Sequence, residues 1–147
     1  MVDALHEVHR VLAPRGVLVD ARPDSRVLAY AERRLAKRYQ RFGKIRTSAE
    51  ELANDSTSDR AVTRVVREGL FARGRRGRFW HRVPFDDLAE LRRYLTEHLR
   101  VATRADWTVD AATRRRYAHE PFVIRRAVRY ELLPRLEPSA KPRRLRT

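Results

Sequence analysis

The chain contains no cysteine and only five glycines among its 147 residues. The absence of cysteine excludes disulfides, thiolate metal sites and cysteine nucleophiles. The glycines at positions 43, 69, 74 and 77 do not follow strands in a G-x-G-x-x-G arrangement, so they predict no dinucleotide-type or cofactor-binding turn. The sequence therefore offers neither a cysteine-based active site nor a glycine-rich cofactor-binding turn.

Long apolar runs are also missing. No stretch approaches the roughly 18 apolar residues that span a bilayer. The first ten residues, MVDALHEVHR, include acidic residues and no apolar block, so they are not expected to be a secretory signal. The expected location is the cytoplasm, and no membrane partner is expected.

Lysine is scarce, because arginine supplies 31 of the 34 basic residues, and the formal net charge is +15. Such a charge attracts nucleic acid and anionic membranes. The arginines are nevertheless spread along the chain, a bias that GC-rich coding also produces. The clusters Arg73–Arg78 and Lys141–Arg146 lack the interleaved aromatic residues of a single-strand-binding surface. We therefore expect a basic surface without a specific partner, and a small basic nucleic-acid-binding module is the alternative.

The opening segment predicts a helix, a turn and a strand. Apolar residues at positions 2, 5, 8, 11 and 12 have helical spacing, and Pro14 ends the pattern. Pro14 and Gly16 suit the second and fourth positions of a type I turn. Val17–Val19 then forms an apolar strand without alternation, which is typical of a strand covered on both faces.

The next 50 residues read as helical. A stripe formed by Leu28, Ala31, Leu35 and Tyr39 predicts a helix over residues 24–42. Residues 44–59 are expected to hold one short helix and a loop, and a further helix should follow Ser58. Together, residues 26–73 are interpreted as a helical insertion that caps a site.

The remaining sequence predicts a strand over residues 78–85, two helices and a last strand over residues 122–133. The last two strands are interpreted as an antiparallel pair, with the last one near a sheet edge. The predicted fold is α/β, with one parallel-type strand, an antiparallel terminal pair and a helical cap in residues 1–133. Residues 134–147 are expected to be a disordered basic tail.

The phrase EVHRVLAPRGVLV resembles the carboxyl-terminal half of class I S-adenosylmethionine-dependent methyltransferases, which have a Rossmann-like fold. In that family, a helix ending in a phrase like RVLKPGG leads into the fifth strand. The matching residues are Glu7, Arg10, Val11, Leu12, Pro14 and Gly16, while Arg15 replaces the family's first glycine. FDDLAELRRYL resembles the stretch after the sixth strand, and PFVIRRAVRYELL resembles the antiparallel seventh strand.

The resemblance implies methyl transfer from S-adenosylmethionine, but only if a missing half completes the domain. The family binds its cofactor with a glycine-rich turn after the first strand and an acidic residue after the second, and both precede the segment that is matched here. We therefore expect a truncated or degenerate methyltransferase-like protein that does not bind S-adenosylmethionine alone and is inactive as an isolated chain.

Four residues are candidates for facing a substrate. Asp20, Arg22 and Asp24 lie at or beyond the carboxyl end of the first strand, where α/β sheets bind ligands. The alternative is that Asp24 caps a helix and Arg22 is solvated. His81 alternates with apolar residues and is interpreted either as a partly buried strand residue or as a general base. No cofactor-binding residue and no metal site is predicted.

The strand Val17–Asp20 is the expected place for a partner. In the resembled fold, the fifth strand lies between a parallel neighbour and the antiparallel last strand. Without the parallel neighbour, one edge offers unpaired backbone groups. Asp20 is the only residue of this strand whose charge would disfavour pairing with another chain. We expect self-association, or a partner chain, along this edge.

Overall fold

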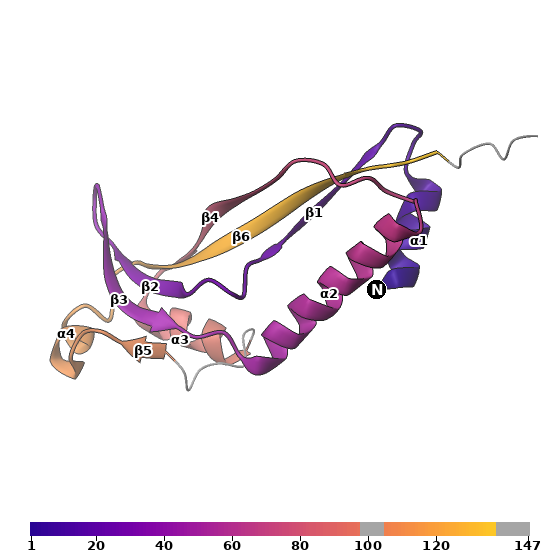
Figure 1. The fold of residues 1–147 in the computed structure, drawn as a ribbon. Coiled ribbons are helices and arrows are strands. Elements are labelled where there is room, and N and C mark those ends of the chain that lie inside the picture. The colour runs from indigo at the N-terminus through magenta and orange to yellow at the C-terminus, as the bar shows by residue number, and fades with distance from the viewer. Residues whose placement is uncertain (98–104, 138–147) are drawn as a thin grey trace, which may run out of the picture. The chain divides into compact units, whose positions relative to one another are not determined.

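The computed structural model describes residues 1–97 and 105–137 (Figure 1). These residues form four helices and a mostly antiparallel six-stranded sheet, so the α/β class is confirmed. The strand order is β1-β6-β2-β3-β5, and β4 pairs with β6. In chain order the elements are α1 (Val2–Val11), β1 (Val17–Pro23), β2 (Ala29–Arg34), β3 (Tyr39–Ile45), α2 (Ala49–Arg67), β4 (Arg76–Phe85), α3 (Leu88–Glu97), β5 (Ala105–Trp107), α4 (Ala111–Arg116) and β6 (Phe122–Pro134).

The chain divides into two compact units. Unit 1 comprises residues 1–21, 56–77 and the chain from residue 130 onward, whereas unit 2 comprises residues 22–55 and 78–129. The boundaries fall inside β1 and α2, inside β4 and inside β6. Each unit has a hydrophobic core of its own.

Unit 1 packs α1 and the second half of α2 around a small apolar core. Its fully buried members are Leu5, Ala61, Val62, Val65, Phe71 and Leu133. The helix predicted at the start of the chain is confirmed, because α1 spans Val2–Val11 and buries Leu5. Gly69 ends α2 in a left-handed conformation, with φ of 76°, and its amide donates to the carbonyl of Val66.

The turn between α1 and β1 differs from the prediction. The amide of Gly16 donates to the carbonyl of Ala13 over 2.8 Å, and Arg15 has a φ of 61°. A positive φ at the third position, after a proline that fixes a negative φ, defines a type II turn rather than a type I turn. The type I interpretation was wrong because the sequence pattern does not reveal the sign of the φ angle at Arg15.

β1 is an edge strand within the described part of the chain. Leu18 packs against the core of unit 1, whereas Val17 and Val19 are 45% and 57% exposed. The prediction that both faces of this strand are covered was therefore wrong. The physical reason is that unit 1 supplies apolar partners on one face only, so side chains alternate between inside and outside.

β6 is an inner strand, which corrects the prediction of a position near a sheet edge. In unit 1, the amide of Arg135 donates to Gly16, and the amide of Gly74 donates to the carbonyl of Leu132. Odd-numbered residues of β6 thus pair toward β1, and even-numbered residues pair toward the chain leading into β4. β4 pairs with β6, so the expected pairing of the last two long strands is confirmed.

A β-hairpin occupies the segment for which a helix was predicted. β2 pairs antiparallel with β3 and, on its other side, with residues 122–125 of β6. Ala31 is fully buried in the core of unit 2, while Leu28 and Tyr39 are each 42% exposed. The helical interpretation failed because pairing of β2 with β3 and β6 overrides the local preference for helix.

α2 is one helix of 19 residues, not a short helix followed by a loop and a second helix. Its amino terminus carries a capping box: the Ser48 hydroxyl accepts from the amide of Glu51, and the Glu51 carboxylate accepts from the amide of Ser48, each over 3.1 Å. The predicted helical cap over residues 26–73 is thus a hairpin followed by a long helix.

The core of unit 2 places α3 against the hairpin (Figure 1). Leu88, Leu91 and Leu95 of α3 share this core with Phe42 of β3 and Phe122 of β6. The short helix α4 (Ala111–Arg116) is capped at its amino terminus by Asp110, whose carboxylate accepts from the amide of Thr113 over 2.7 Å. That hydrogen bond lowers the pKa of Asp110 below its ordinary value.

The predicted disordered tail lies mostly outside the described residues, which end at residue 137. The first part of that segment is ordered. Pro134 belongs to β6, and the amide of Leu136 donates to the carbonyl of Leu70 over 2.9 Å. The ordered chain therefore continues three residues past the end of β6.

Candidate functional site

Two buried polar residues follow the end of β1. Asp24 and Ser25 are 5% and 8% exposed, respectively. One carboxylate oxygen of Asp24 accepts from the amide of Arg26 at 3.3 Å, and the other lies 2.6 Å from the guanidinium of Arg78. Asp24 thus closes a local turn instead of capping a helix, and its charge is paired with an arginine of β4.

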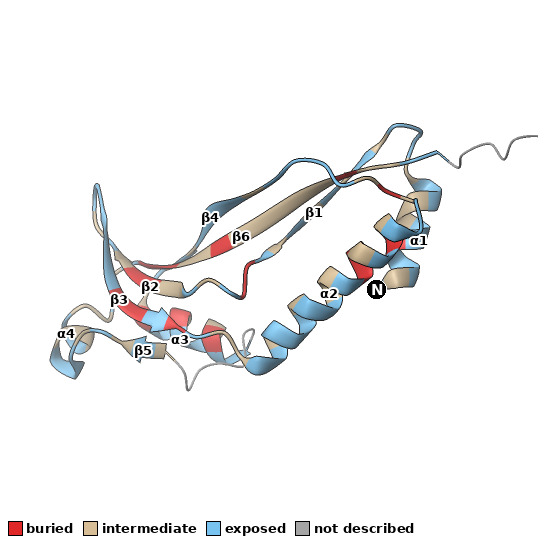
Figure 2. Cartoon of the chain, in the orientation of Figure 1, coloured by how far each residue is buried: buried red, intermediate tan, exposed pale blue. Residues whose placement is uncertain are grey.

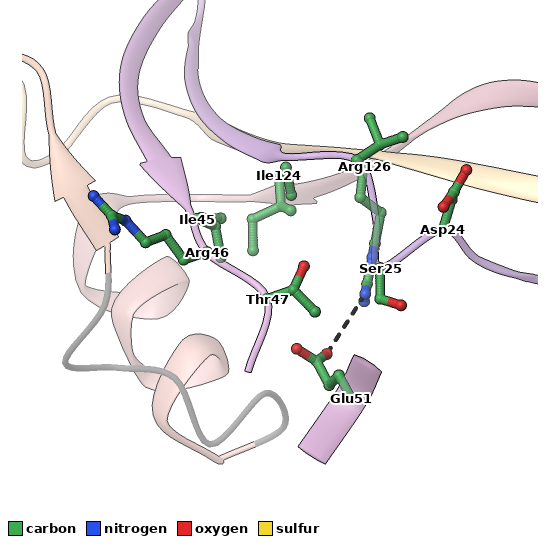
Figure 3. A pocket seen from close by; sticks show the side chains of 10 residues that line it. Asp24, Ser25, Ile45, Arg46, Thr47, Glu51, Ile124 and Arg126 are labelled. Atoms are coloured by element: carbon green, nitrogen blue, oxygen red, sulfur yellow. Dashed lines mark ion pairs between the residues drawn. The ribbon is translucent and has the colours of Figure 1, made fainter. Parts of the chain in front are cut away.

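The first turns of α2 bring two carboxylates to the same region of unit 2. Asp55 accepts hydrogen bonds from the hydroxyl and the amide of Ser25, and lies 3.5 Å from the guanidinium of Arg129. Glu51 lies 3.7 Å from the guanidinium of Arg126 (Figure 3). Opposite charges therefore face one another between α2 and β6, as burial of charged groups requires.

A cavity of about 20 Å³ lies beside these residues in unit 2. Figure 3 shows Asp24, Ser25, Thr47, Glu51 and Arg126 around it, with Ile45 and Ile124 on its apolar side. A volume of this size holds one water molecule and no larger ligand. The polar cluster at the end of β1 consequently holds the hairpin, α2 and β6 together, and it offers no room for a substrate.

The four predicted site residues are divided between the two units, because Asp20 lies in unit 1 whereas Arg22, Asp24 and His81 lie in unit 2. Asp20 and Arg22 are both half-buried and engaged in interactions within the chain. The carboxylate of Asp24 contacts Arg78 and the turn, and not His81. His81 is exposed on β4, which corrects the prediction of a partly buried strand residue.

No metal centre is found among the described residues, because no three histidine, aspartate or glutamate side chains gather closely enough. In unit 1, His6 lies 2.6 Å from the carboxylate of Glu68, and His9 lies 3.0 Å from the carbonyl oxygen of Leu136. None of the described helices is both long and apolar enough to cross a membrane.

The residues present do not fit S-adenosylmethionine by themselves. A glycine-rich cofactor turn needs open space beside its glycines, so that the backbone can approach the ligand. Most glycines here are instead packed against their own chain. A Cβ atom would lie within 3.0 Å of another atom at Gly16 (Leu12), Gly43 (Trp107), Gly74 (Leu132) and Gly77 (Tyr130).

A group of aromatic and charged side chains lies on the sheet face of unit 2 opposite the core. Because side chains alternate along a strand, Tyr30 and Glu32 point away from Ala29 and Ala31, which pack in the core. The guanidinium of Arg125 lies 4.1 Å from the ring centre of Trp80, and the Tyr30 and Trp80 rings are 6.4 Å apart. We call this surface the arginine–aromatic face; its members are Tyr30, Tyr39, Arg41, Trp80, Arg82 and Arg125.

Glu32 lies beneath this face and is 4% exposed. Its carboxylate oxygens lie 3.7 Å from Arg125 Nε and 4.0 Å from Arg82 Nε, and Oε2 has no hydrogen-bond partner within the protein. These distances permit Coulomb attraction but are too long for hydrogen bonds. Both guanidinium groups are therefore attracted to Glu32 without a hydrogen bond to it, and Arg125 Nε itself is buried.

The sequence analysis missed the arginine–aromatic face because its residues come from four strands. Tyr30 and Glu32 lie in the segment interpreted as a helix. Alternate residues share a face in a strand but not in a helix, so the alternation with Ala29 and Ala31 did not indicate a common face. A usable signal was present on β4, where Arg78, Trp80 and Arg82 recur at every second position. Only the pairing of β2 and β4 with β6 brings these positions together.

Comparisons with known proteins yielded no relative. The chain matches no protein-family model, no curated protein and no solved structure.

Proposed function

We propose that this chain forms one half of a Rossmann-like methyltransferase domain, located in the cytoplasm. Methyl transfer from S-adenosylmethionine would then require a complementary half that supplies the cofactor site. The chain by itself is a truncated or degenerate form that does not carry out the reaction. The observation that carries this proposal is the pairing of β1 with the antiparallel last strand β6 on one edge, while its other edge pairs with no strand among the described residues.

The surroundings of β1 support the proposal. In the resembled family, the fifth strand lies between a parallel neighbour and the antiparallel last strand. Here β6 occupies one edge of β1, and the other edge pairs with no strand in the described part of the chain. Val17 and Val19 leave apolar surface beside that edge. A complementary half would satisfy the backbone groups and cover both valines.

The turn before β1 is a second line of support. The family has two glycines where this chain has Arg15 and Gly16. Arg15 adopts a positive φ, the conformation for which glycine is suited. A Cβ atom on Gly16 would lie 2.6 Å from Leu12 Cγ, so this position requires glycine. The backbone thus has the shape that both family glycines favour, even where the side chain differs.

The test compares this chain with an extended one. The genomic DNA upstream of the Met1 codon is read in frame, and any longer open frame is expressed and titrated with S-adenosylmethionine by calorimetry. We expect the extension to encode a strand, a glycine-rich turn and an acidic residue, and the extended protein to bind. We expect no saturable heat from the 147-residue chain.

Two results would contradict the proposal. One is an upstream frame that lacks both the glycine-rich turn and the acidic residue. The other is binding of S-adenosylmethionine by this chain alone with a Kd below about 100 μM, which corresponds to about −5 kcal/mol. A thermal-shift titration with the same ligand provides an independent readout, since a ligand that binds only the folded state raises the Tm.

A further inference from the structure

The arginine–aromatic face combines exposed rings with unneutralised positive charge. Trp80 is 41% exposed and Tyr39 is 42% exposed. Arg41 lies 3.9 Å above the Tyr30 ring, and Arg82 lies 4.4 Å above the Tyr39 ring. Figure 2 shows β4, which contributes Trp80 and Arg82, exposed over most of its length. Rings and guanidinium planes therefore alternate across neighbouring strands of one sheet.

The charges on this face favour an anionic partner. Three arginines belong to it, and Glu32 is the acidic residue that pairs with two of them. Since both Glu32 contacts exceed hydrogen-bond distance, Arg82 and Arg125 keep donors for an incoming acceptor. The Arg41 guanidinium lies over the Tyr30 ring and has no hydrogen bond or ion pair with another described residue, so its donors are also available. Guanidinium donors of this kind bind phosphate oxygens strongly.

We infer that the arginine–aromatic face binds single-stranded nucleic acid. A base stacks on Trp80, and Arg41, Arg82 and Arg125 contact the phosphates. Sheet-borne aromatic residues with surrounding basic groups are a general solution for unpaired bases, whereas a duplex keeps its bases stacked on one another and out of reach of the rings. This inference goes beyond the proposed function and does not depend on it.

The experiment uses the full chain and a fluorescein-labelled oligothymidylate, with binding followed by fluorescence anisotropy over a range of salt concentrations. Stacking of a base on an aromatic ring contributes about 1–3 kcal/mol, so Trp80→Ala should weaken binding about fivefold or more. Each phosphate contact on a single strand contributes about −0.7 to the slope of log K against log salt. Arg41→Ala should therefore reduce the steepness of that slope by about 0.7.

Matched control variants separate a specific surface from diffuse charge. Phe79→Ala removes an exposed ring from the same strand but from its opposite face. Arg93→Ala removes an exposed charge from α3. Both should leave the affinity within about twofold of the unmodified chain, a difference of about 0.4 kcal/mol. Equal losses for Trp80→Ala and Phe79→Ala, or for Arg41→Ala and Arg93→Ala, would overturn the inference.

Two competitors test the choice of partner. A DNA duplex of the same length and polyglutamate are each added to the preformed complex. We expect the unlabelled single strand to compete best. Equal or better competition by the duplex indicates binding to phosphates alone, and better competition by polyglutamate indicates an acidic protein partner. Either result refutes single-strand recognition.

Tryptophan fluorescence gives a readout that is independent of affinity. The chain has two tryptophans, so Trp107→Phe leaves Trp80 as the sole tryptophan. Stacking of a base on Trp80 should quench its emission as the oligothymidylate is added. The reverse variant, Trp80→Phe, reports on Trp107 and should show little change. Binding without quenching of Trp80 would contradict base stacking on this face.

Discussion

At the scale of single residues, Arg15 is the one non-glycine residue with a positive φ in the part of the chain that the structure describes. Its φ of 61° lies in the left-handed region, which costs a residue with a Cβ atom roughly 1–2 kcal/mol. The next residue offers no relief, because a Cβ atom at Gly16 would also lie 2.8 Å from the carbonyl oxygen of Ala13. The left-handed residue of this turn therefore stays at position 15.

Replacing Arg15 with glycine should stabilise the protein. Arg15→Gly removes the left-handed strain, while the greater freedom of glycine in the unfolded chain returns roughly 0.5–1 kcal/mol of that gain. We expect the free energy of unfolding, measured by urea denaturation, to rise by about 0.5–1 kcal/mol. Gly16→Ala is the control and should destabilise. A fall in stability for Arg15→Gly would show that the side chain stabilises the turn.

The ion pair between Asp24 and Arg78 gives a second prediction. The Asp24 side chain is 3% exposed, so Arg78→Ala leaves a buried carboxylate without its counterion. Loss of a partner to a buried polar group costs about 1–3 kcal/mol, and we expect the free energy of unfolding to fall by that amount. Arg76→Ala, an exposed change on the same strand, should stay within about 0.5 kcal/mol of the unmodified chain. Equal effects of the two substitutions would refute a structural role for the pair.

At the scale of elements, sequence pattern succeeded where one periodicity dominated. The stripe from Val2 to Leu12 and the apolar run at Val17–Val19 correspond to α1 and β1, and the alternation in residues 78–85 corresponds to β4. The patterns of α1 and β4 each have a single reading because helical and extended spacing select different faces. The strand at β5 was not expected, because three residues carry too little periodicity.

The β2–β3 hairpin shows why the rest could not be predicted. Alanine and arginine favour helices, and the spacing of Leu28, Ala31 and Leu35 fits one. The same residues also fit a strand in which Ala29 and Ala31 face inward. The choice is made by β6, nearly 100 residues away, whose residues 122–125 pair with β2. The candidate sites depend on the same pairing, so Glu32 and Tyr30 could not be placed from sequence.

The two halves of α2 should differ in local stability. Residues Leu52–Asn54 are exposed, whereas Val62 and Val65 are buried in the core of unit 1. Opening of the first half disrupts few apolar contacts, so its amides should exchange with solvent faster. Hydrogen exchange resolved by NMR measures both halves in one experiment. Exchange at Leu52–Asn54 as slow as at Val65 would contradict this expectation.

At the scale of the whole molecule, the edge of β1 that pairs with no described strand predicts self-association. Val17 and Val19 offer apolar surface, and pairing with a second chain satisfies the exposed backbone groups. The net charge of +15 opposes contact between copies, so association should increase as salt screens the repulsion. Light scattering over a concentration series should give a mass that rises above 17.4 kDa, and most strongly at high salt.

Val19→Lys is the matched variant for this prediction. It places a charge on an already exposed position, which is how natural edge strands avoid pairing. The variant should fold normally and remain a monomer over the same concentrations. A monomeric unmodified chain at every salt concentration would refute edge pairing. It would also weaken the proposal that a complementary half of the domain pairs with the edge of β1.

The strained turn at Arg15 also has a genetic consequence. Every arginine codon differs from a glycine codon by a single base, so the residue that relieves the left-handed backbone is one mutational step away. Most stabilising changes in a core require coordinated repacking, whereas this one requires no change elsewhere. A random library of the gene, screened for protein that stays folded at raised temperature, should therefore return glycine codons at position 15 early.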